Sequence, residues 1–166
     1  MLNMEDSTGY RVRKAVDYFM QGYGCCQSVV AAFADLYGLS EDQAFRIGAG
    51  FGGGVGRMRM MCGAVSGLVI LSGLDSGQTE GADRAGKADC YRVVQELLAE
   101  FKEDNGSIIC AELLGLAGKP DAGSAHSFVP DERTAEYYRK RPCAAKVASA
   151  AGIFARYLSS KGQADL

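Results

Sequence analysis

The sequence predicts an all-α fold, a compact single-domain bundle of about six to seven helices with glycine-rich loops. Apolar residues recur at helical spacing along most of the chain, and no segment alternates apolar and polar residues for long enough to form a sheet. The 166 residues include 22 glycines and only three prolines, which is typical of helices joined by tight turns. Because the length suits one hydrophobic core and no linker or repeat divides the chain, we expect residues 1–166 to form a single domain.

The first two predicted helices are separated by a glycine-containing turn. We expect the first helix over residues 8–20, where apolar side chains form one face. The second helix begins at Cys25 or Cys26 and carries apolar residues at helical spacing through Leu36. Gly38 is the expected C-terminal stop, because glycine adopts the left-handed conformation that commonly ends a helix.

A third and a fourth helix flank a glycine-rich segment. A capping-box pattern at Ser40 and Gln43 opens a short third helix that reaches residue 47. The glycine-rich segment 48–56 is expected to be a loop or an element that approaches another part of the protein closely. A fourth helix over residues 62–74 is apolar on nearly all sides, which places it at the centre of the core.

The second half of the chain predicts one long helix, over residues 82–104, and several shorter elements. These elements are a helical turn, a polar loop, a helix with basic residues near its end, and a final helix with Pro142 in its first turn, over residues 111–114, 119–130, 131–140 and 143–158. The sole histidine, His126, lies in the polar loop, where a surface position is expected rather than a metal-ligand role.

Composition and charge exclude several classes of function. The net charge is −2 with both signs interspersed, so nothing favours a nucleic-acid partner. No apolar run is long enough to cross a membrane, and the N-terminal residues lack the pattern of a secretory signal. We therefore expect a cytoplasmic, reducing location. No pairing of a nucleophile with a base supports a hydrolase.

The six cysteines give the strongest indication of function. In a reducing compartment they do not suggest a disulfide framework, which leaves packed apolar thiols, a metal or cluster site, or thiol redox chemistry. No Cys-x-x-Cys pair is present, so the short-range zinc and thioredoxin signatures are absent. Spacing alone therefore supports a functional cluster and buried core thiols equally.

The positions of the cysteines on the predicted helices distinguish them. Three open predicted helices, where unpaired N–H groups stabilise a thiolate: Cys25, Cys62 and Cys143. Basic residues precede two of these, with Arg57 and Arg59 before the second and residues 139–141 before the third. Cys110 is expected in a loop after the long helix, and Cys90 is expected within that helix as a packed thiol.

Several blocks of the sequence occur in the order and spacing of a known family. They read Gly-Tyr-Gly-Cys-Cys-Gln-Ser-Val-Val at 22–30, Gly-Phe-Gly-Gly-Gly at 50–54, Cys-Gly-Ala-Val-Ser-Gly at 62–67, Gly-Ser-Ile-Ile-Cys-Ala-Glu-Leu-Leu-Gly at 106–115, and a last cysteine at 143 before the final helix. Over about residues 22–160 the chain resembles the C_GCAxxG_C_C family, whose members are described as redox-active proteins.

The resemblance implies a set of site residues and a cofactor. The family's characteristic cysteines correspond to Cys25, Cys62, Cys110 and Cys143. Cys26 stands where the family usually has alanine and is therefore accessory. A similar domain occurs in split-Soret cytochromes with an iron–sulfur centre, so the resemblance implies electron transfer through an iron–sulfur cluster that the four cysteines hold as metal ligands. Four glycines are expected to bring backbone close to this cofactor: Gly24, Gly52, Gly53 and Gly63.

Two other uses of the same cysteines stay open. In a thiol-disulfide redox protein, one of the adjacent thiols Cys25 and Cys26 would attack and be resolved by Cys62 or Cys143. In a non-catalytic helical module, the cysteines would hold structural zinc or simply pack. The sequence identifies no reaction and no redox partner protein, and it leaves a homodimer open.

Overall fold

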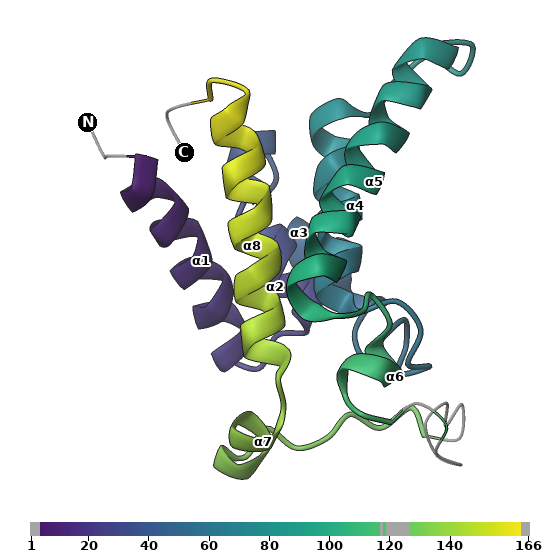
Figure 1. Cartoon of the computed structure of the whole chain (residues 1–166). Coiled ribbons are helices and arrows are strands. Elements are labelled where there is room, and N and C mark those ends of the chain that lie inside the picture. Colours follow the sequence, from purple (N-terminus) through teal and green to yellow (C-terminus); the bar gives the residue numbers. More distant parts are fainter. Residues whose placement is uncertain (1–3, 117, 119–126, 164–166) are drawn as a thin grey trace.

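The computed structural model describes residues 4–116, 118 and 127–163, and in this part of the chain it confirms the all-α prediction (Figure 1). The described residues contain eight α-helices and one short 3-10 helix, η1 (Ala34–Tyr37). The described residues form no strand, only an isolated antiparallel bridge between Met61 and Ile109. The number of α-helices slightly exceeds the expected six to seven because the helical turn predicted at residues 111–114 forms a short helix over Cys110–Leu113. His126 and the rest of residues 119–126 lie outside the described residues.

The helices of the first half are α1 (Met4–Met20), α2 (Cys25–Ala31), η1 (Ala34–Tyr37), α3 (Glu41–Ala49) and α4 (Gly63–Ser76). The predicted capping box begins α3, since the Ser40 hydroxyl accepts a hydrogen bond from the Gln43 amide (3.2 Å) and the Gln43 side chain accepts one from the Ser40 amide (2.9 Å). Gly38 ends η1 in a left-handed conformation with φ 68°, as its predicted role as a stop requires.

The second helix ends earlier than predicted. Instead of continuing through Leu36, α2 stops at Ala31, and η1 follows. The buried Arg11 side chain of α1 donates a hydrogen bond of 2.8 Å to the Ala32 carbonyl, and its guanidinium also pairs with Asp35. This long-range contact takes up a carbonyl that a continuing helix would use for its own ladder, so helical spacing alone could not locate the end.

The helices of the second half are α5 (Arg84–Asn105), α6 (Cys110–Leu113), α7 (Ala135–Lys140) and α8 (Cys143–Ser160). Cys110 is the first residue of α6 rather than a loop residue. The helix predicted over residues 131–140 begins only at Ala135, because Thr134 caps it by accepting a hydrogen bond of 3.1 Å from the Tyr137 amide. Asp131 lies outside this helix and binds two arginines of the site.

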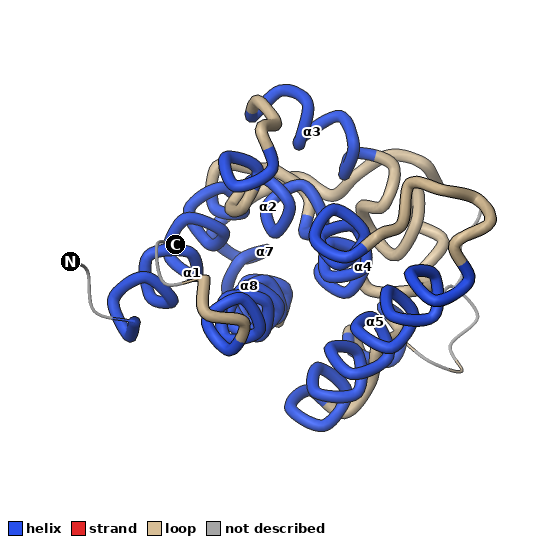
Figure 2. The backbone as a smooth tube through the Cα atoms, turned by 90° about the horizontal axis from the view of Figure 1, so that it is seen from above, coloured by secondary structure: helices blue, strands red, loops and turns tan. Residues whose placement is uncertain are grey.

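The apolar helix α4 lies in the core as predicted, with its first six residues all buried. It packs against α2, α5 and α8, while α1 packs against α2 and α8. Figure 2 shows the resulting arrangement, in which α3 lies outside α2 and α5 lies outside α4. Fully buried phenylalanines fill the space between the helices: Phe19, Phe33, Phe101 and Phe154. None of the helices that the structure describes has the length and apolarity needed to cross a membrane.

Candidate redox site

A cavity of about 550 Å³ lies at the end of the bundle where several helices begin. All four cysteines implied by the family resemblance line it: Cys25, Cys62, Cys110 and Cys143. Each lies at a helix start, as the first residue of α2, α6 or α8 or as the N-cap of α4. Figure 1 shows α6, α7 and the start of α8 gathered at this end. Neither Cys26 nor Cys90 is among the described residues that line the cavity.

Two segments that are distant in sequence pair at the cavity and hold Cys62 beside Cys110. Three backbone hydrogen bonds join them, from the amides of Cys62, Cys110 and Ala111 to the carbonyls of Ile108, Met60 and Arg59, at 2.8, 2.6 and 3.2 Å. The isolated bridge between Met61 and Ile109 belongs to the same pairing. The register of this short ladder therefore sets how the two cysteines lie relative to each other.

The glycine-rich loop before Cys62 lies at the cavity wall and contains several residues with a left-handed backbone conformation. Gly53 and Gly54 have φ values of 64° and 72°, and three non-glycine residues share this conformation: Val55, Arg57 and Arg59, at 65°, 65° and 60°. A Cβ atom on Gly54 would lie 2.6 Å from the Cβ atom of Cys110. Positive φ is costly for residues with a Cβ atom, and such strain is found mainly where the surrounding structure enforces it at functional sites.

The glycines expected near a cofactor all line the cavity: Gly24, Gly52, Gly53 and Gly63. Gly63 lets the start of α4 approach α2, because a Cβ atom there would lie only 3.1 Å from the Cβ atom of Cys25. Gly67, one turn further along α4, instead packs against Val29 of α2. A Cβ atom on Gly67 would lie 2.8 Å from the Val29 side chain. Close helix packing therefore accounts for Gly67 and leaves Gly63 beside a cysteine.

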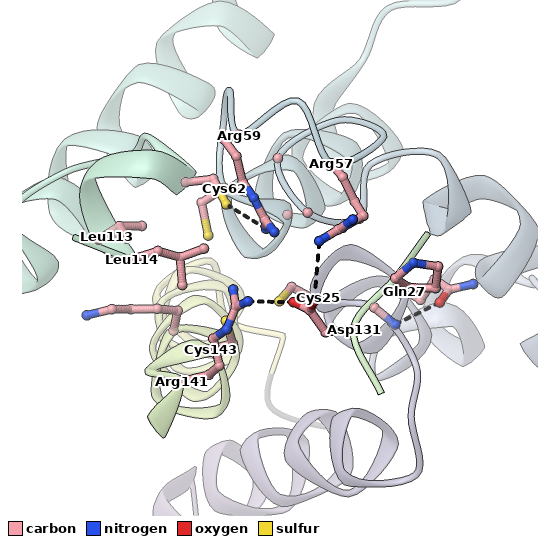
Figure 3. Close-up of a pocket in the computed structure, with 18 of the residues that line it drawn as sticks. Cys25, Gln27, Arg57, Arg59, Cys62, Leu113, Leu114, Asp131, Arg141 and Cys143 are labelled. Carbon is pink, nitrogen blue, oxygen red and sulfur yellow. Dashed lines mark hydrogen bonds and ion pairs between the residues drawn. The ribbon is translucent and has the colours of Figure 1, made fainter. Parts of the chain in front are cut away.

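The described residues of the cavity wall carry five basic side chains and a single carboxylate: Arg57, Arg59, Arg133, Arg141, Lys146 and Asp131. Figure 3 shows Arg57 and Arg141 on either side of Asp131, which they contact at 3.4 and 2.5 Å. The Arg59 guanidinium donates instead to the Cys110 Sγ atom at 3.9 Å. The wall is therefore strongly positive, although the whole chain has a net charge of −2.

Sequence reasoning missed three of these residues, Arg133, Lys146 and Asp131. Arg133 is held by ring contacts with Phe19 and Tyr137, at 4.5 and 4.8 Å from their centroids, and it donates to two backbone carbonyls of the α1–α2 turn. No local motif marks such a residue, because its partners lie far away in the chain. The sequence feature that indicated a positively charged wall was the group of basic residues 139–141 before Cys143. Of these, Arg141 lines the cavity.

The thiols of Cys25 and Cys143 interact with each other and shift each other's pKa in opposite directions. The hydrogen bond from Cys25 lowers the pKa of Cys143 to about 7, and the positive charges of Arg141 and Arg133 act in the same direction against the effect of burial. The same hydrogen bond and burial raise the pKa of Cys25 well above its usual range. Cys143 is therefore the member of the pair that ionises first.

The other cysteines correct the expectation that every helix start favours a thiolate. Burial raises the pKa of Cys62 to about 11, although the backbone N–H groups of Val65 and Ala64 oppose this shift. Burial also raises the pKa of Cys110, with Arg59 acting against it. Cys26 has no exposed surface, and burial raises its pKa to about 12. Desolvation thus outweighs the helix terminus wherever no thiol or arginine compensates sufficiently.

The spacing of the donors bears on which metal centre the cavity fits. Among the described residues, no group of three cysteine, histidine or acidic side chains is arranged to hold one metal ion. A tetrahedral zinc site with Zn–S bonds of about 2.3 Å would place its sulfurs about 3.8 Å apart. Binding a single metal ion through these cysteines would therefore require them to move closer together.

A family model described as "Putative redox-active protein (C_GCAxxG_C_C)" matches residues 23–157. The match covers most of the 166 residues, including the four cysteines and the glycines of the cavity wall. No curated protein and no solved structure matches the chain. The resemblance seen in the sequence is thus confirmed, and the chain belongs to the C_GCAxxG_C_C family of putative redox-active proteins.

Proposed function

We propose that the protein transfers electrons through an iron–sulfur cluster held by Cys25, Cys62, Cys110 and Cys143. The observation that carries the proposal is the convergence of these four thiols on one positively charged cavity. They come from four separate helix starts. The two cysteines outside the cavity wall are Cys26, which the family resemblance makes accessory, and Cys90, which its place within a helix makes a packed thiol. Four thiolates are the usual ligand set for [2Fe–2S] and [4Fe–4S] clusters.

The charges of the wall support an anionic occupant. A cluster with four thiolate ligands carries net negative charge, and the arginines around the cavity would offset that charge as the thiols lose their protons. The tight glycine positions Gly54 and Gly63 keep backbone close to the Cβ atoms of Cys110 and Cys25. Such close backbone and hydrogen bonds to sulfur adjust the potential of a cluster.

The residues at the site would have different roles. When bound, the cluster supplies one-electron redox chemistry, which thiols alone do not. The cysteines would fix its position, while the pairing of residues 59–62 with 108–111 holds two of them in register. Arg133 would hold the segment before Cys25 at the cavity wall, because it donates to the backbone carbonyls of Phe19 and Tyr23. The redox partner would exchange electrons at the cavity mouth.

Metal and sulfide analysis after anaerobic purification tests the proposal. We expect the wild-type protein to contain iron and acid-labile sulfide and to show visible absorbance that dithionite bleaches. The Cys62→Ser variant should lose most of the iron, whereas Cys90→Ser is the matched control because Cys90 lies in the middle of α5. Zinc in place of iron, or a colourless protein without metal after reconstitution with iron and sulfide, would contradict the cluster.

A second candidate function uses only the interacting pair of Cys25 and Cys143. The Cys143 thiolate would attack a substrate disulfide and release one substrate thiolate. Cys25 would then lose its proton and attack the Cys143 sulfur, which breaks the mixed disulfide, releases the second thiolate and leaves a Cys25–Cys143 disulfide. An external dithiol would reduce that disulfide again. The lowered pKa of Cys143 favours this chemistry, because the thiolate is the attacking species.

Oxidation of metal-free protein separates the two functions. If the pair exchanges disulfides, oxidised dithiothreitol should convert Cys25 and Cys143 into one intramolecular disulfide, detected by peptide mapping. The Cys143→Ser variant should not react, and Cys90→Ser should react as the wild-type protein does. Iron-free protein that forms no such cross-link would exclude this candidate without affecting the cluster proposal.

A further inference from the structure

The contact between Arg59 and Cys110 distinguishes this arginine from the other basic residues of the cavity wall. Its guanidinium donates to the Cys110 Sγ atom at 3.9 Å. The other basic side chains have different partners: Arg57 binds the segment 127–131, Arg141 binds Asp131, Arg133 binds backbone carbonyls, and Lys146 binds Asn105. Within the described part of the wall, Arg59 is thus the basic residue whose hydrogen bond is made to a cysteine sulfur.

The backbone at Arg59 is built to keep this contact. Arg59 has a left-handed φ of 60°, a conformation that is strained for a residue with a Cβ atom. Two hydrogen bonds enforce it, since the Arg59 amide donates to the Gly53 carbonyl at 3.1 Å and the Arg59 carbonyl accepts from the Ala111 amide at 3.2 Å. The second bond comes from the residue that follows Cys110, so the arginine and the cysteine are fixed by the same pairing of segments.

We propose that Arg59 is the positioning residue that holds the Cys110 sulfur and sets the reduction potential of the site, an inference that rests on the proposed cluster. A reduced cluster carries one more negative charge than an oxidised cluster. A half-buried guanidinium at one of its sulfur ligands stabilises the reduced form more strongly and therefore raises the midpoint potential. The positive charge and the hydrogen bond to sulfur both contribute to this effect.

Potentiometric titration of three anaerobically reconstituted variants tests the inference. Arg59→Gln should lower the midpoint potential, whereas Arg59→Lys, which keeps the charge at the same strained position, should remain closer to the wild type. Arg156→Gln is the matched control, because it also removes one positive charge but from an exposed ion pair with Glu100. The potential of this control should not change.

Several outcomes would overturn the role of Arg59. An unchanged potential in Arg59→Gln, even with reduced iron content, would leave it a merely structural residue. An equal shift in Arg156→Gln would show that only the net charge matters. If the wild-type protein binds no iron, the proposed cluster fails, and the metal-free protein still tests the contact. Cys110 should then react with iodoacetamide several-fold more slowly in Arg59→Gln than in Arg59→Lys at one fixed pH, and equal rates would refute the inference.

Discussion

The thiols of Cys25 and Cys143 interact with each other at the cavity wall, although the two residues begin α2 and α8. Their interaction makes the two thiols unequal, with a lowered pKa at Cys143 and a raised pKa at Cys25. Arg141 favours the thiolate at Cys143, whereas Arg133 lowers the pKa of both thiols. A helix start alone does not produce this difference, because both residues occupy one.

The first prediction concerns the pH dependence of Cys143. Because its pKa is lowered to about 7, the thiolate fraction of Cys143 should rise as the pH increases through 7. An ordinary thiol ionises only at a higher pH. The rate of alkylation in metal-free protein, measured by mass spectrometry, should follow this rise. In the Cys25→Ala variant the main cause of the shift is removed, so the midpoint should move to higher pH. A midpoint in wild-type protein near the ordinary thiol value would contradict the pairing.

The second prediction concerns Gly54 in the left-handed loop. Gly54→Ala adds a Cβ atom 2.6 Å from the Cβ atom of Cys110 and 2.8 Å from the Met60 amide nitrogen. Gly56→Ala is the matched control, because Gly56 has a positive φ of 56° but no heavy atom within 4 Å of the added Cβ. Both substitutions should lower the free energy of unfolding by roughly 1–2 kcal/mol through the backbone. Urea unfolding should show a clearly larger loss of the free energy of unfolding for Gly54→Ala than for Gly56→Ala. Only Gly54→Ala should reduce iron binding. Equal effects of the two substitutions would contradict this account.

The third prediction concerns the ion pair between Arg11 and Asp35, close to the end of α2. The Arg11 side chain is only 3% exposed, whereas its partner Asp35 is 53% exposed. Asp35→Asn therefore leaves a buried guanidinium without its counter-charge and should lower the free energy of unfolding by about 2–3 kcal/mol. Arg11→Met leaves the Asp35 carboxylate, which water can solvate. It should therefore lower the free energy of unfolding by less than Asp35→Asn does. Denaturant unfolding of both variants measures the difference, and a larger loss for Arg11→Met would refute the explanation.

The sequence predicted the starts of α2, α3, α4 and α8 to within one residue, because capping residues, glycines and apolar spacing act within a few positions. Ser40 and Gln43 begin α3, and three of the cysteines open helices at or within one residue of the expected position. Family resemblance then selected the cysteines that line the cavity. These parts of the site follow from local signals and ordered motifs.

The remaining features depend on contacts between distant segments. Arg57 and Arg59 precede Cys62 in the sequence, yet Arg59 donates to Cys110 because the two segments pair. The early end of α2 depends on Arg11 from another helix. The raised pKa of Cys62 follows from its burial, with 6% of its surface exposed, and not from its helix position. Neither periodicity nor spacing contains this information.

The iron content of six single Cys→Ser variants tests the central claim most directly, which is that four cysteines act as one site. After anaerobic reconstitution, Cys25→Ser, Cys62→Ser, Cys110→Ser and Cys143→Ser should each lose most of the iron and visible absorbance. Cys26→Ser and Cys90→Ser should retain the wild-type level, because neither residue lies among the described residues of the cavity wall. Full retention of iron by any of the first four variants, or its loss in either of the last two, would contradict the claim.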